Sequence, residues 1–533
     1  MHPAPIRFAI LHGDARFEKW QTRCLVQLRA LPDVRLDLLL LTQKSALGLP
    51  PDLADVAQIL LPGSRESAAS PETTAAVEQL KACDVDFVLS FVDVHYPPEI
   101  VSVPRYGVWQ FHFGDWTRYR GGPAGFWEVY DGEPVSAALL TRVLSRDSIM
   151  VLREGYFRTD LLSYARNKEK LLARVAIWPA QLCTDIRNGV IRRFGGRIVP
   201  GAAAVRTVPT RRQLLSCGCR IAVRAFGVAW RSLFCHDQWN VGVVDQPIAA
   251  FLRPDNRPLV RWLPSQKRSE MRADPFGVQR NGRLTILCEH LNYRDNRGFI
   301  VAIESMSDAR YVRVRIGPTP PVHMSYPYLV EGDERMLCIP ETSEPQEIAL
   351  YECERFPDRW IKLANFVTGR AVVDASLFHH GKHWWIAGSE VAPKGANCEL
   401  HLWYSQSVVG PWHPHPGNPV KIDVRSARPA GTPFIEGGVL YRPAQDCSRT
   451  YGGRVIINRV FTLTPLEYHE EAVAQVDPDP AGPYPSGLHT LSKVGNITLI
   501  DGKRTRFIPA IIRRVLSKKL NEVLKRSNAP AAH

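Results

Sequence analysis

The sequence has no uninterrupted apolar run long enough to span a membrane. A transmembrane helix needs about 20 consecutive, mostly apolar residues, whereas the apolar stretch at residues 34–41 is of strand length and contains Arg35 and Asp37. The amino terminus has a short apolar stretch followed soon by acidic residues, which is not the pattern of a secretory signal peptide. The sequence therefore predicts neither a membrane span nor a signal peptide.

Cysteine clusters with metal-ligand spacing are also lacking. The eleven cysteines are scattered, no CxxC occurs, and only Cys217 and Cys219 lie close together. Without a second cluster nearby, this pair fits buried small residues better than zinc ligands, and we expect no metal. Scattered cysteines without a disulfide framework are typical of a reducing compartment, so we expect a cytoplasmic protein.

Glycine-rich phosphate-binding motifs are missing, because neither GxGxxG nor GxxxxGKS follows the first expected strand. The 67 basic residues exceed the 53 acidic ones and give a net charge of +14, much of it at residues 166–231 and 503–526. Such charge suits phosphate binding. No recognised nucleic-acid module accompanies it, however, so we expect no nucleic-acid partner.

The carboxyl-terminal tail, residues 501–533, predicts a basic amphipathic helix. Its apolar side chains fall on one helical face opposite the cations, and they are Ile511, Ile512, Val515, Leu516, Leu520, Val523 and Leu524. Such a face fits either an anionic membrane surface or the body of the same protein. The first environment would allow peripheral membrane contact and would suit a lipid-linked sugar acceptor.

The chain of 533 residues is too long for one hydrophobic core. Residues 1–160 alternate strand-like runs with polar helical stretches, which indicates an α/β domain with a mainly parallel sheet. Residues 161–234 predict a connector of basic helices. Residues 235–500 change to short strands, turns and tryptophans, which predicts an all-β domain, and the tail follows.

Chemistry-bearing residues concentrate between positions 106 and 158. His112 precedes the pair Arg120-Gly121, and Asp147 follows about one supersecondary unit later. This order resembles the catalytic domain of the folate-dependent formyltransferases, the family of methionyl-tRNA and sugar-nucleotide formyltransferases. The residues that match the family at its spacing are His112, Tyr119, Arg120, Gly121, Pro123 and Asp147, preceded by the strand at residues 86–91 and a proline-rich loop. The resemblance covers about residues 1–160 and implies a Rossmann-like fold.

The resemblance also implies a reaction, the transfer of a formyl group from 10-formyltetrahydrofolate to an amine. In it, Gln110 and His112 would polarise the formyl oxygen, while Asp147 would orient His112 and relay a proton. The residues expected to contact the folate are Phe91, Val94, Tyr96, Arg120 and Gly121. The family has asparagine where this chain has Gln110, and Asp115-Trp116-Thr117 replaces its Leu-Leu-Pro. Glutamine keeps the amide donor but adds one methylene, which can misplace that donor.

Four segments of the all-β region repeat one pattern: a strand, a turn rich in Gly or Asp/Asn, a second strand and usually a terminal acid. They begin at Asp274, Tyr326, Asp374 and Thr432, at a spacing of about 50 residues. This period predicts the blades of a β-propeller, and residues 239–243 make a fifth blade possible. The pattern resembles the five-bladed arabinanase-like glycosidases and the N-terminal region of plant glucosamine inositolphosphorylceramide transferases.

Blade-edge side chains in such a propeller converge on an axial pocket. The candidates here are Asp274, Asp374 and Glu390, with His323 and Arg428 nearby in the repeat pattern. We expect a formyltransferase acting on an amino sugar, nucleotide-linked or lipid-linked, with the propeller recognising the glycan. Two alternatives stay open, a propeller glycosidase and a non-catalytic carbohydrate-binding or scaffold protein.

Overall fold

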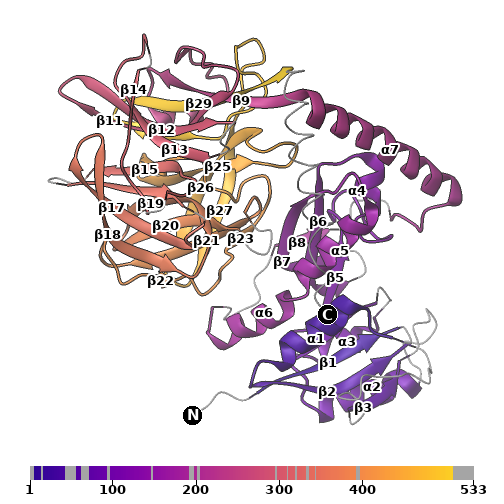
Figure 1. Cartoon of the computed structure of the whole chain (residues 1–533). Coiled ribbons are helices and arrows are strands. Elements are labelled where there is room, and N and C mark those ends of the chain that lie inside the picture. Colours follow the sequence, from indigo (N-terminus) through magenta and orange to yellow (C-terminus); the bar gives the residue numbers. More distant parts are fainter. Residues whose placement is uncertain are drawn as a thin grey trace, which may run out of the picture. The chain divides into compact units, whose positions relative to one another are not determined.

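The computed structural model divides into two compact units, Met1–Ile221 and Ala222–His533 (Figure 1). It describes residues 5–13, 16–42, 56–61, 71–92, 96–145, 148–190, 197–200, 205–293, 297–308, 310–318, 321–331, 335–342, 344–391 and 396–507. Of the expected site residues, Val94 and Asp147 lie outside these ranges. The same holds for residues 508–533, which include the amphipathic part of the expected tail.

One eight-stranded sheet forms the centre of the first unit, in the order β3-β2-β1-β4-β5-β6-β7-β8. The strands are β1 (Ile6–His12), β2 (Val34–Leu41), β3 (Ala57–Leu60), β4 (Phe87–Ser90), β5 (Val108–Phe113), β6 (Val135–Ser145), β7 (Ser148–Arg158) and β8 (Ile198–Pro200). Strands β1 to β5 pair in parallel, and β5 to β8 are antiparallel. The α/β fold with a Rossmann-like parallel region is confirmed.

Seven helices accompany the described part of this sheet and its connections. They are α1 (Lys19–Arg29), α2 (Pro71–Ala82), α3 (Pro98–Ser102), α4 (Phe126–Asp131), α5 (Tyr164–Val175), α6 (Trp178–Arg187) and α7 (Arg211–Phe234). Strands β1 and β4 are almost wholly buried because the parallel part of the sheet is covered on its faces. Strand β8 comes from the segment expected as a connector, so part of that segment completes the sheet.

The second unit contains five antiparallel sheets, which are the blades of the predicted propeller. Four of them take their strands in chain order: β11 (Glu270–Arg280) to β14 (Tyr311–Arg313), β15 (Ser325–Glu331) to β18 (Arg359–Thr368), β19 (Val372–His380) to β22 (His413–Pro414), and β24 (Phe434–Glu436) to β27 (Tyr468–Val476). The intervening strands are β12 (Arg283–Asn292), β13 (Arg297–Ile303), β16 (Met336–Glu341), β17 (Glu347–Arg355), β20 (His383–Glu390), β21 (Glu399–Ser405), β25 (Val439–Asp446) and β26 (Arg454–Leu463), and β23 (Lys421–Ile422) pairs with β21. The five-bladed architecture is confirmed.

The remaining blade joins the two ends of the propeller. It is built from β9 (Cys235–Val244) and β10 (Val260–Trp262), together with β28 (Leu491–Val494) and β29 (Ile497–Phe507). Strands β9 and β29 pair without interruption from Cys235↔Phe507 to Val244↔Thr498. Strand β29 thus continues past residue 500 to Phe507. This pairing closes the propeller ring.

Candidate functional site

Strand β5 places the two expected formyl-transfer residues on one face of the first sheet. Its side chains alternate, so Trp109 and Phe111 lie on one face and Gln110 and His112 on the other. Trp109 is buried and stacks on Phe87 with ring centroids 3.8 Å apart. This aromatic packing fixes the strand, and the alternation then directs the polar pair to the opposite face.

The Gln110 side chain holds the loop that follows β4. Its Nε2 donates a hydrogen bond to the carbonyl oxygen of Val92 at 3.1 Å. Tyr96 and Ser90 donate to the same oxygen from their hydroxyl groups, both at 3.0 Å. Three donors therefore gather on one carbonyl, so the Gln110 amide is directed at the loop. Tyr96, expected to contact folate, belongs to this network.

His112 and Arg120 meet at Trp116. The His112 and Trp116 ring centroids are 4.4 Å apart, and the Arg120 guanidinium lies 4.5 Å from the centre of the Trp116 ring. The chain reaches this position by turning at Gly114, where φ is +122° and a Cβ would lie 2.8 Å from the Tyr119 carbonyl oxygen. The sequence pattern missed Trp116 because it occupies a position where the formyltransferases have leucine or proline.

Two other expected folate contacts lie in different surroundings. Phe91 packs edge-on against Trp20, at 5.3 Å, and stacks on Phe111, so it lies on the face opposite His112. Gly121 has a φ of +70°, and a Cβ there would approach the Arg206 carbonyl oxygen to 3.1 Å. The structure thus brings His112 and Arg120 together around Trp116 but places Phe91 elsewhere.

Glu128 on α4 is a buried carboxyl group that the sequence analysis did not single out. Burial raises its pKa to about 7, and Asp131 and Asp115 add to the increase. Its Oε1 has no hydrogen-bond partner among the described residues. Glu128 can therefore exchange a proton near neutral pH. The sequence of the helix, FWEVYD, does not indicate that the pKa of its glutamate is raised.

The propeller repeats an unusual backbone feature at the start of three innermost strands. Asp274, Tyr326 and Asp374 all have positive φ, between 46° and 53°. Each lies in a register shift of its strand pair, and each is the first residue of a repeat recognised in the sequence. Positive φ is costly for a residue with a side chain. The same conformation in three blades aims three polar side chains in equivalent directions.

The second strand of each blade adds a side chain at a matching position. Glu289 pairs with Ala273, Glu341 with Ser325, and Ser389 with Val373, in each case just before the positive-φ residue. Glu289 is buried and Glu341 is half-buried, and both interact electrostatically with Asp274 and Asp374. Blade symmetry therefore concentrates carboxyl groups at the centre of the ring.

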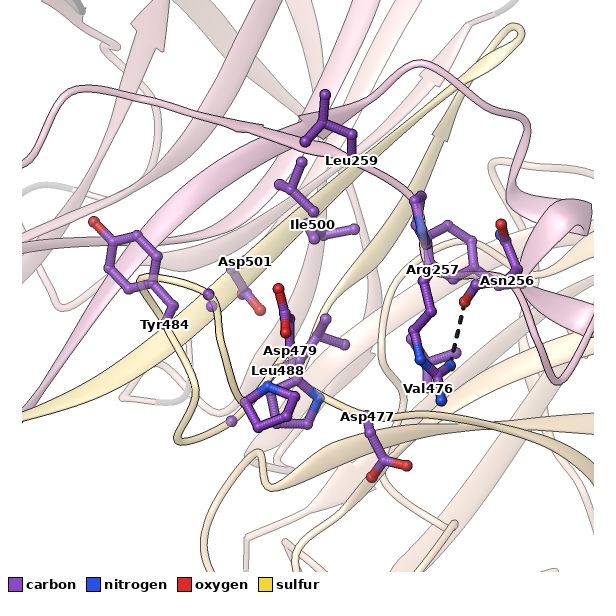
Figure 2. Close-up of a pocket in the computed structure, with 18 of the residues that line it drawn as sticks. Asn256, Arg257, Leu259, Val476, Asp477, Asp479, Tyr484, Leu488, Ile500 and Asp501 are labelled. Carbon is purple, nitrogen blue, oxygen red and sulfur yellow. Dashed lines mark hydrogen bonds between the residues drawn. The ribbon is translucent and has the colours of Figure 1, made fainter.

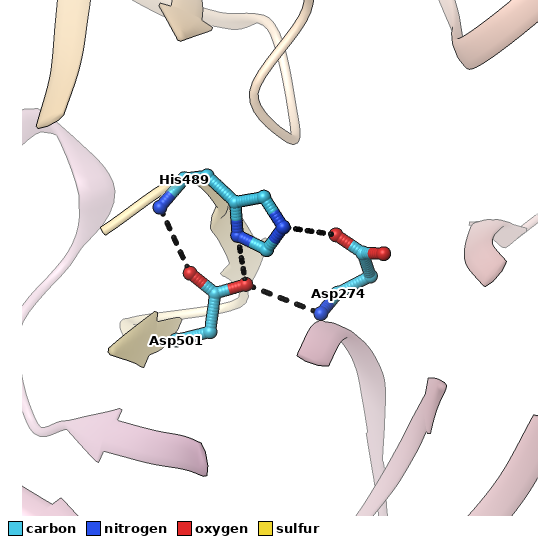
Figure 3. A group of neighbouring side chains, drawn as sticks. All are labelled: Asp274, His489 and Asp501. Atoms are coloured by element: carbon cyan, nitrogen blue, oxygen red, sulfur yellow. Dashed lines mark hydrogen bonds and ion pairs between the residues drawn. The ribbon is translucent and has the colours of Figure 1, made fainter. Parts of the chain in front are cut away.

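The closing blade supplies a histidine between two of these acids (Figure 3). His489 Nδ1 lies 2.5 Å from Asp501 Oδ2, and His489 Nε2 lies 3.4 Å from Asp274 Oδ1. The imidazole stacks on Trp239 with centroids 4.0 Å apart. Thr490 Oγ1 donates to Asp274 Oδ1 at 3.0 Å. The sequence analysis named only Asp274 of this triad.

Burial and neighbouring charges shift the pKa values of Asp274 and His489, the two members of the triad that can exchange a proton. Burial raises the pKa of Asp274 to about 6, with His489 opposing and Asp374 and Asp501 adding to the increase. Burial lowers the pKa of His489, but Asp501 and Asp274 outweigh it, so the pKa is raised overall. Asp274 and His489 therefore titrate as a coupled pair, and the triad can share a proton.

Asp274, His489 and Asp501 also lie close enough together to coordinate a metal ion. Asp501, however, already accepts hydrogen bonds from the backbone N–H groups of Asp274, His489 and Thr490 at 2.9 to 3.2 Å. Both ring nitrogens of His489 face carboxylates. These contacts suit a proton relay better than a metal centre.

Asp374 and Arg428 form a second buried group. The Arg428 Nε lies 2.5 Å from Asp374 Oδ2, and Gln445 Nε2 donates to the same oxygen at 2.6 Å. The Asp374 backbone N–H donates to Glu341 Oε2 at 3.1 Å. Burial and the neighbouring Asp374 raise the pKa of Glu341 well above its usual value, although Arg428 opposes the increase. The expected pair Asp374 and Arg428 is thus brought together.

His323 and Glu390, the other two expected residues, have different positions. His323 Nε2 lies 3.4 Å from Glu289 Oε1, so it borders the central acids. Glu390 instead pairs with Arg370 at 2.6 Å and lies 3.4 Å from His401. Ser389 occupies the register position that Glu289 and Glu341 hold in their blades. A shift of one residue along a strand reverses the face, and this separates Glu390 from the central contacts.

A cavity of about 500 Å³ adjoins the closing blade (Figure 2). Its walls come from residues 251–262 and the proline-rich segment 475–488, and they include Trp262, Tyr484 and Asp501. Asp501 therefore belongs both to the cavity wall and to the triad with His489. The sequence patterns did not reveal this cavity.

A protein-family comparison matches residues 262–480 to the model described as "Glucosamine inositolphosphorylceramide transferase 1, N-terminal". Two relatives carry the name glucosamine inositolphosphorylceramide transferase 1. The protein of Oryza sativa subsp. japonica is 34% identical over 206 residues, which are 38% of this chain and 28% of the rice protein. That of Arabidopsis thaliana is 32% identical over 210 residues, 38% of this chain and 27% of its own length. The chain thus spans under a third of either relative, and the predicted resemblance of the propeller is supported.

Among solved structures, the first unit's fold is similar to glycinamide ribonucleotide transformylase 1 from Symbiobacterium toebii, at 16% identity and a TM-score of 0.30 over 37% of this chain and 94% of that one. A family 117 glycoside hydrolase from Zobellia galactanivorans gives 11% identity and a TM-score of 0.33, covering 50% of this chain and 90% of that one. These scores are low, and we draw no functional argument from them.

Replacing Arg428 with glutamine should destabilise the protein strongly, because Asp374 would be left as a buried carboxylate without its cation. We expect a loss of about 3–5 kcal/mol in the free energy of unfolding, measured by chemical denaturation. Arg425→Gln is the matched control, since Arg425 pairs with Asp423 at 2.8 Å while its side chain is 43% exposed. The control should cost at most about 1 kcal/mol. Equal losses would contradict a special role for the buried pair.

The raised pKa of Asp274 predicts a pH dependence of stability. The folded protein keeps a proton on Asp274 that the unfolded chain releases, so stability should fall as pH rises from about 4 to about 6. The full shift corresponds to roughly 3 kcal/mol. We expect Asp274→Asn to reduce this slope in denaturation midpoints measured across that range. Asp255→Asn, in an exposed loop of the same unit, should keep the wild-type slope.

Proposed function

We propose that this protein is a transferase of glycan biosynthesis, which moves a formyl group from 10-formyltetrahydrofolate to the amine of an amino sugar. The observation that carries the proposal is the pairing, in one chain, of two sites. One is the β5 edge with His112, Trp116 and Arg120, and the other is a propeller with a buried centre of acids. The first suits the transfer of an acyl group to an amine, and the second suits recognition of a hydroxyl-rich acceptor.

The names of the relatives support the choice of acceptor. Both matched proteins are named for glucosamine, an amino sugar, and the match lies in the propeller. We infer that the propeller of this chain binds a glucosamine-type residue or a glycan that contains one. Buried carboxylates and the Arg428 guanidinium are groups that bind sugar hydroxyls through strong, charge-assisted hydrogen bonds.

The donor substrate supplies a formyl carbon, whose bond to the folate nitrogen breaks as a bond to the acceptor nitrogen forms. In our proposal His112 donates a hydrogen bond to the formyl oxygen, where negative charge develops. The proton lost by the amine passes to the departing folate nitrogen, a relay that the sequence resemblance assigns to Asp147, which lies outside the described residues. His112 and Arg120 are only half-buried, so both remain accessible to a bound donor. Gln110 positions the loop after β4 through its bond to Val92.

His112→Ala should remove formyl transfer while leaving the fold intact. We expect saturable binding of a stable 10-formyltetrahydrofolate analogue in titration calorimetry, and formyl transfer to glucosamine-containing acceptors. The rate of transfer should fall by about 10²- to 10⁴-fold in His112→Ala. The control is His379→Ala, an exposed histidine of β19 outside both sites. Absence of both folate binding and transfer in the wild-type protein would refute this function.

Glycoside hydrolysis is the second candidate, and the pKa of Asp274 favours it. A carboxyl group that titrates near 6 can act as a general acid, and Asp374, which pairs with Arg428, can serve as the second carboxyl group. This function predicts sugar release that Asp374→Asn abolishes and His112→Ala leaves unchanged. Release of sugar from oligosaccharide substrates, measured by chromatography, separates the two candidates. Loss of release in His112→Ala as well would contradict a separate propeller activity.

A further inference from the structure

Helix α7 presents two different faces, and only one of them is covered. Cys217 is buried, and it packs with Ile221 in an aromatic cluster of the first unit formed by Tyr119, Phe126 and Trp127. Arg220, on the same side, donates to the Tyr130 carbonyl oxygen at 3.1 Å. Among the residues of α7, only Cys217 is fully buried. The helix is therefore anchored along one narrow strip.

Large apolar side chains occupy the other side of α7. The exposed fractions are 72% for Leu215, 73% for Val223, 72% for Phe226 and 51% for Trp230. At 100° per residue these four lie within about 80° of one another, and Ile221 lies on the opposite side of the helix. Trp230 also packs on Phe234, with ring centroids 4.1 Å apart. The result is a continuous apolar face on a helix of 24 residues.

The charge of α7 indicates what covers this face. The helix contains five arginines, Arg211, Arg212, Arg220, Arg224 and Arg231, and no acidic residue. A second copy of the helix would bring arginines against arginines. Residues 508–533 of the same chain carry six basic residues against one acid, so they are no better matched. An exposed apolar face on a helix whose charged residues are all cations is complementary to an anionic lipid surface.

We propose that α7 lies in the interface of an anionic membrane, with Leu215, Val223, Phe226 and Trp230 inserted and the exposed Arg211 and Arg212 at the lipid phosphates. Among the described residues, no helix is both long and apolar enough to cross a bilayer. An interfacial position does not require that length. The proposal is independent of the formyl-transfer function, because it rests on the exposed face and the charge of α7 alone.

The test is co-flotation of the full chain with lipid vesicles. One set contains phosphatidylcholine alone, and the other also contains the anionic lipid phosphatidylglycerol. We expect binding to the anionic vesicles, weakened by high salt. The double variant Phe226→Gln/Trp230→Gln should bind at least about tenfold less, because each ring loses its apolar burial. Ile361→Gln, at an exposed apolar residue of β18, is the matched control and should bind like wild type. Both changes are at exposed positions, and thermal unfolding will show whether the fold is kept.

Three results would overturn the proposal. The first is no preference for anionic vesicles, and the second is unchanged binding by the double variant. The third is loss of binding on truncation after Phe507, which would assign the contact to the terminal segment. A lipid-free dimer that the double variant dissociates, seen by sedimentation, would identify a second copy as the occupant. Membrane binding and formyl transfer are scored separately, so failure of one leaves the other intact.

Discussion

The pairing of β9 with β29 is the constraint on which the propeller site depends. It joins the beginning of the domain at Cys235 to its end at Phe507. His489 and Asp501 lie in the segment that this pairing holds in place, while Asp274 comes from the following blade. The Asp274–His489–Asp501 contacts therefore exist only in the closed ring. This long-range closure brings together side chains from residues more than 200 positions apart in the sequence.

Closing the ring also concentrates like charges, and the structure compensates locally. Asp274, Glu289, Glu341 and Asp374 would repel one another if all were ionised in a buried setting. Arg428 and Gln445 satisfy Asp374 directly, whereas the raised pKa of Glu289 and Glu341 favours their protonated forms. The centre therefore holds both ionised and neutral carboxyl groups, which can accept and donate hydrogen bonds respectively. Such a mixture matches a ligand rich in hydroxyl groups.

The sequence predicted the blades because their pattern is local, but it could not predict which residue of each blade faces the axis. Glu289, Glu341 and Glu390 are each the terminal acid of a repeat in the sequence, yet Glu390 is displaced by one register position, and Ser389 takes its place. The fifth blade was predicted from residues 239–243, but its other segment was not recognised, although residues 489–501 show the same strand, turn, strand and terminal acid. Its first residue is His489, where two of the other repeats begin with aspartate, and Asp501 is its terminal acid. Applying the repeat pattern of strand, turn, strand and terminal acid to residues 489–501 would have identified His489 and Asp501, two members of the triad.

In the first unit, the sequence order of His112 and Arg120 was informative because His112 lies near the end of β5 and Arg120 lies in the short connection that follows. The role of Trp116 could not be predicted from the sequence, because its contacts with His112 and Arg120 exist only in the folded chain. The structural role of Gln110 also could not be predicted from the sequence. Compared with asparagine, glutamine has one more methylene, and its amide reaches the Val92 carbonyl, so the replacement couples strand β5 to the loop after β4. The Gln110 amide is therefore engaged by the scaffold, and in the proposed reaction the polarisation of the formyl oxygen falls to His112. The proposed transfer thus depends on one histidine, where the formyltransferases that the sequence resembles have an asparagine and a histidine.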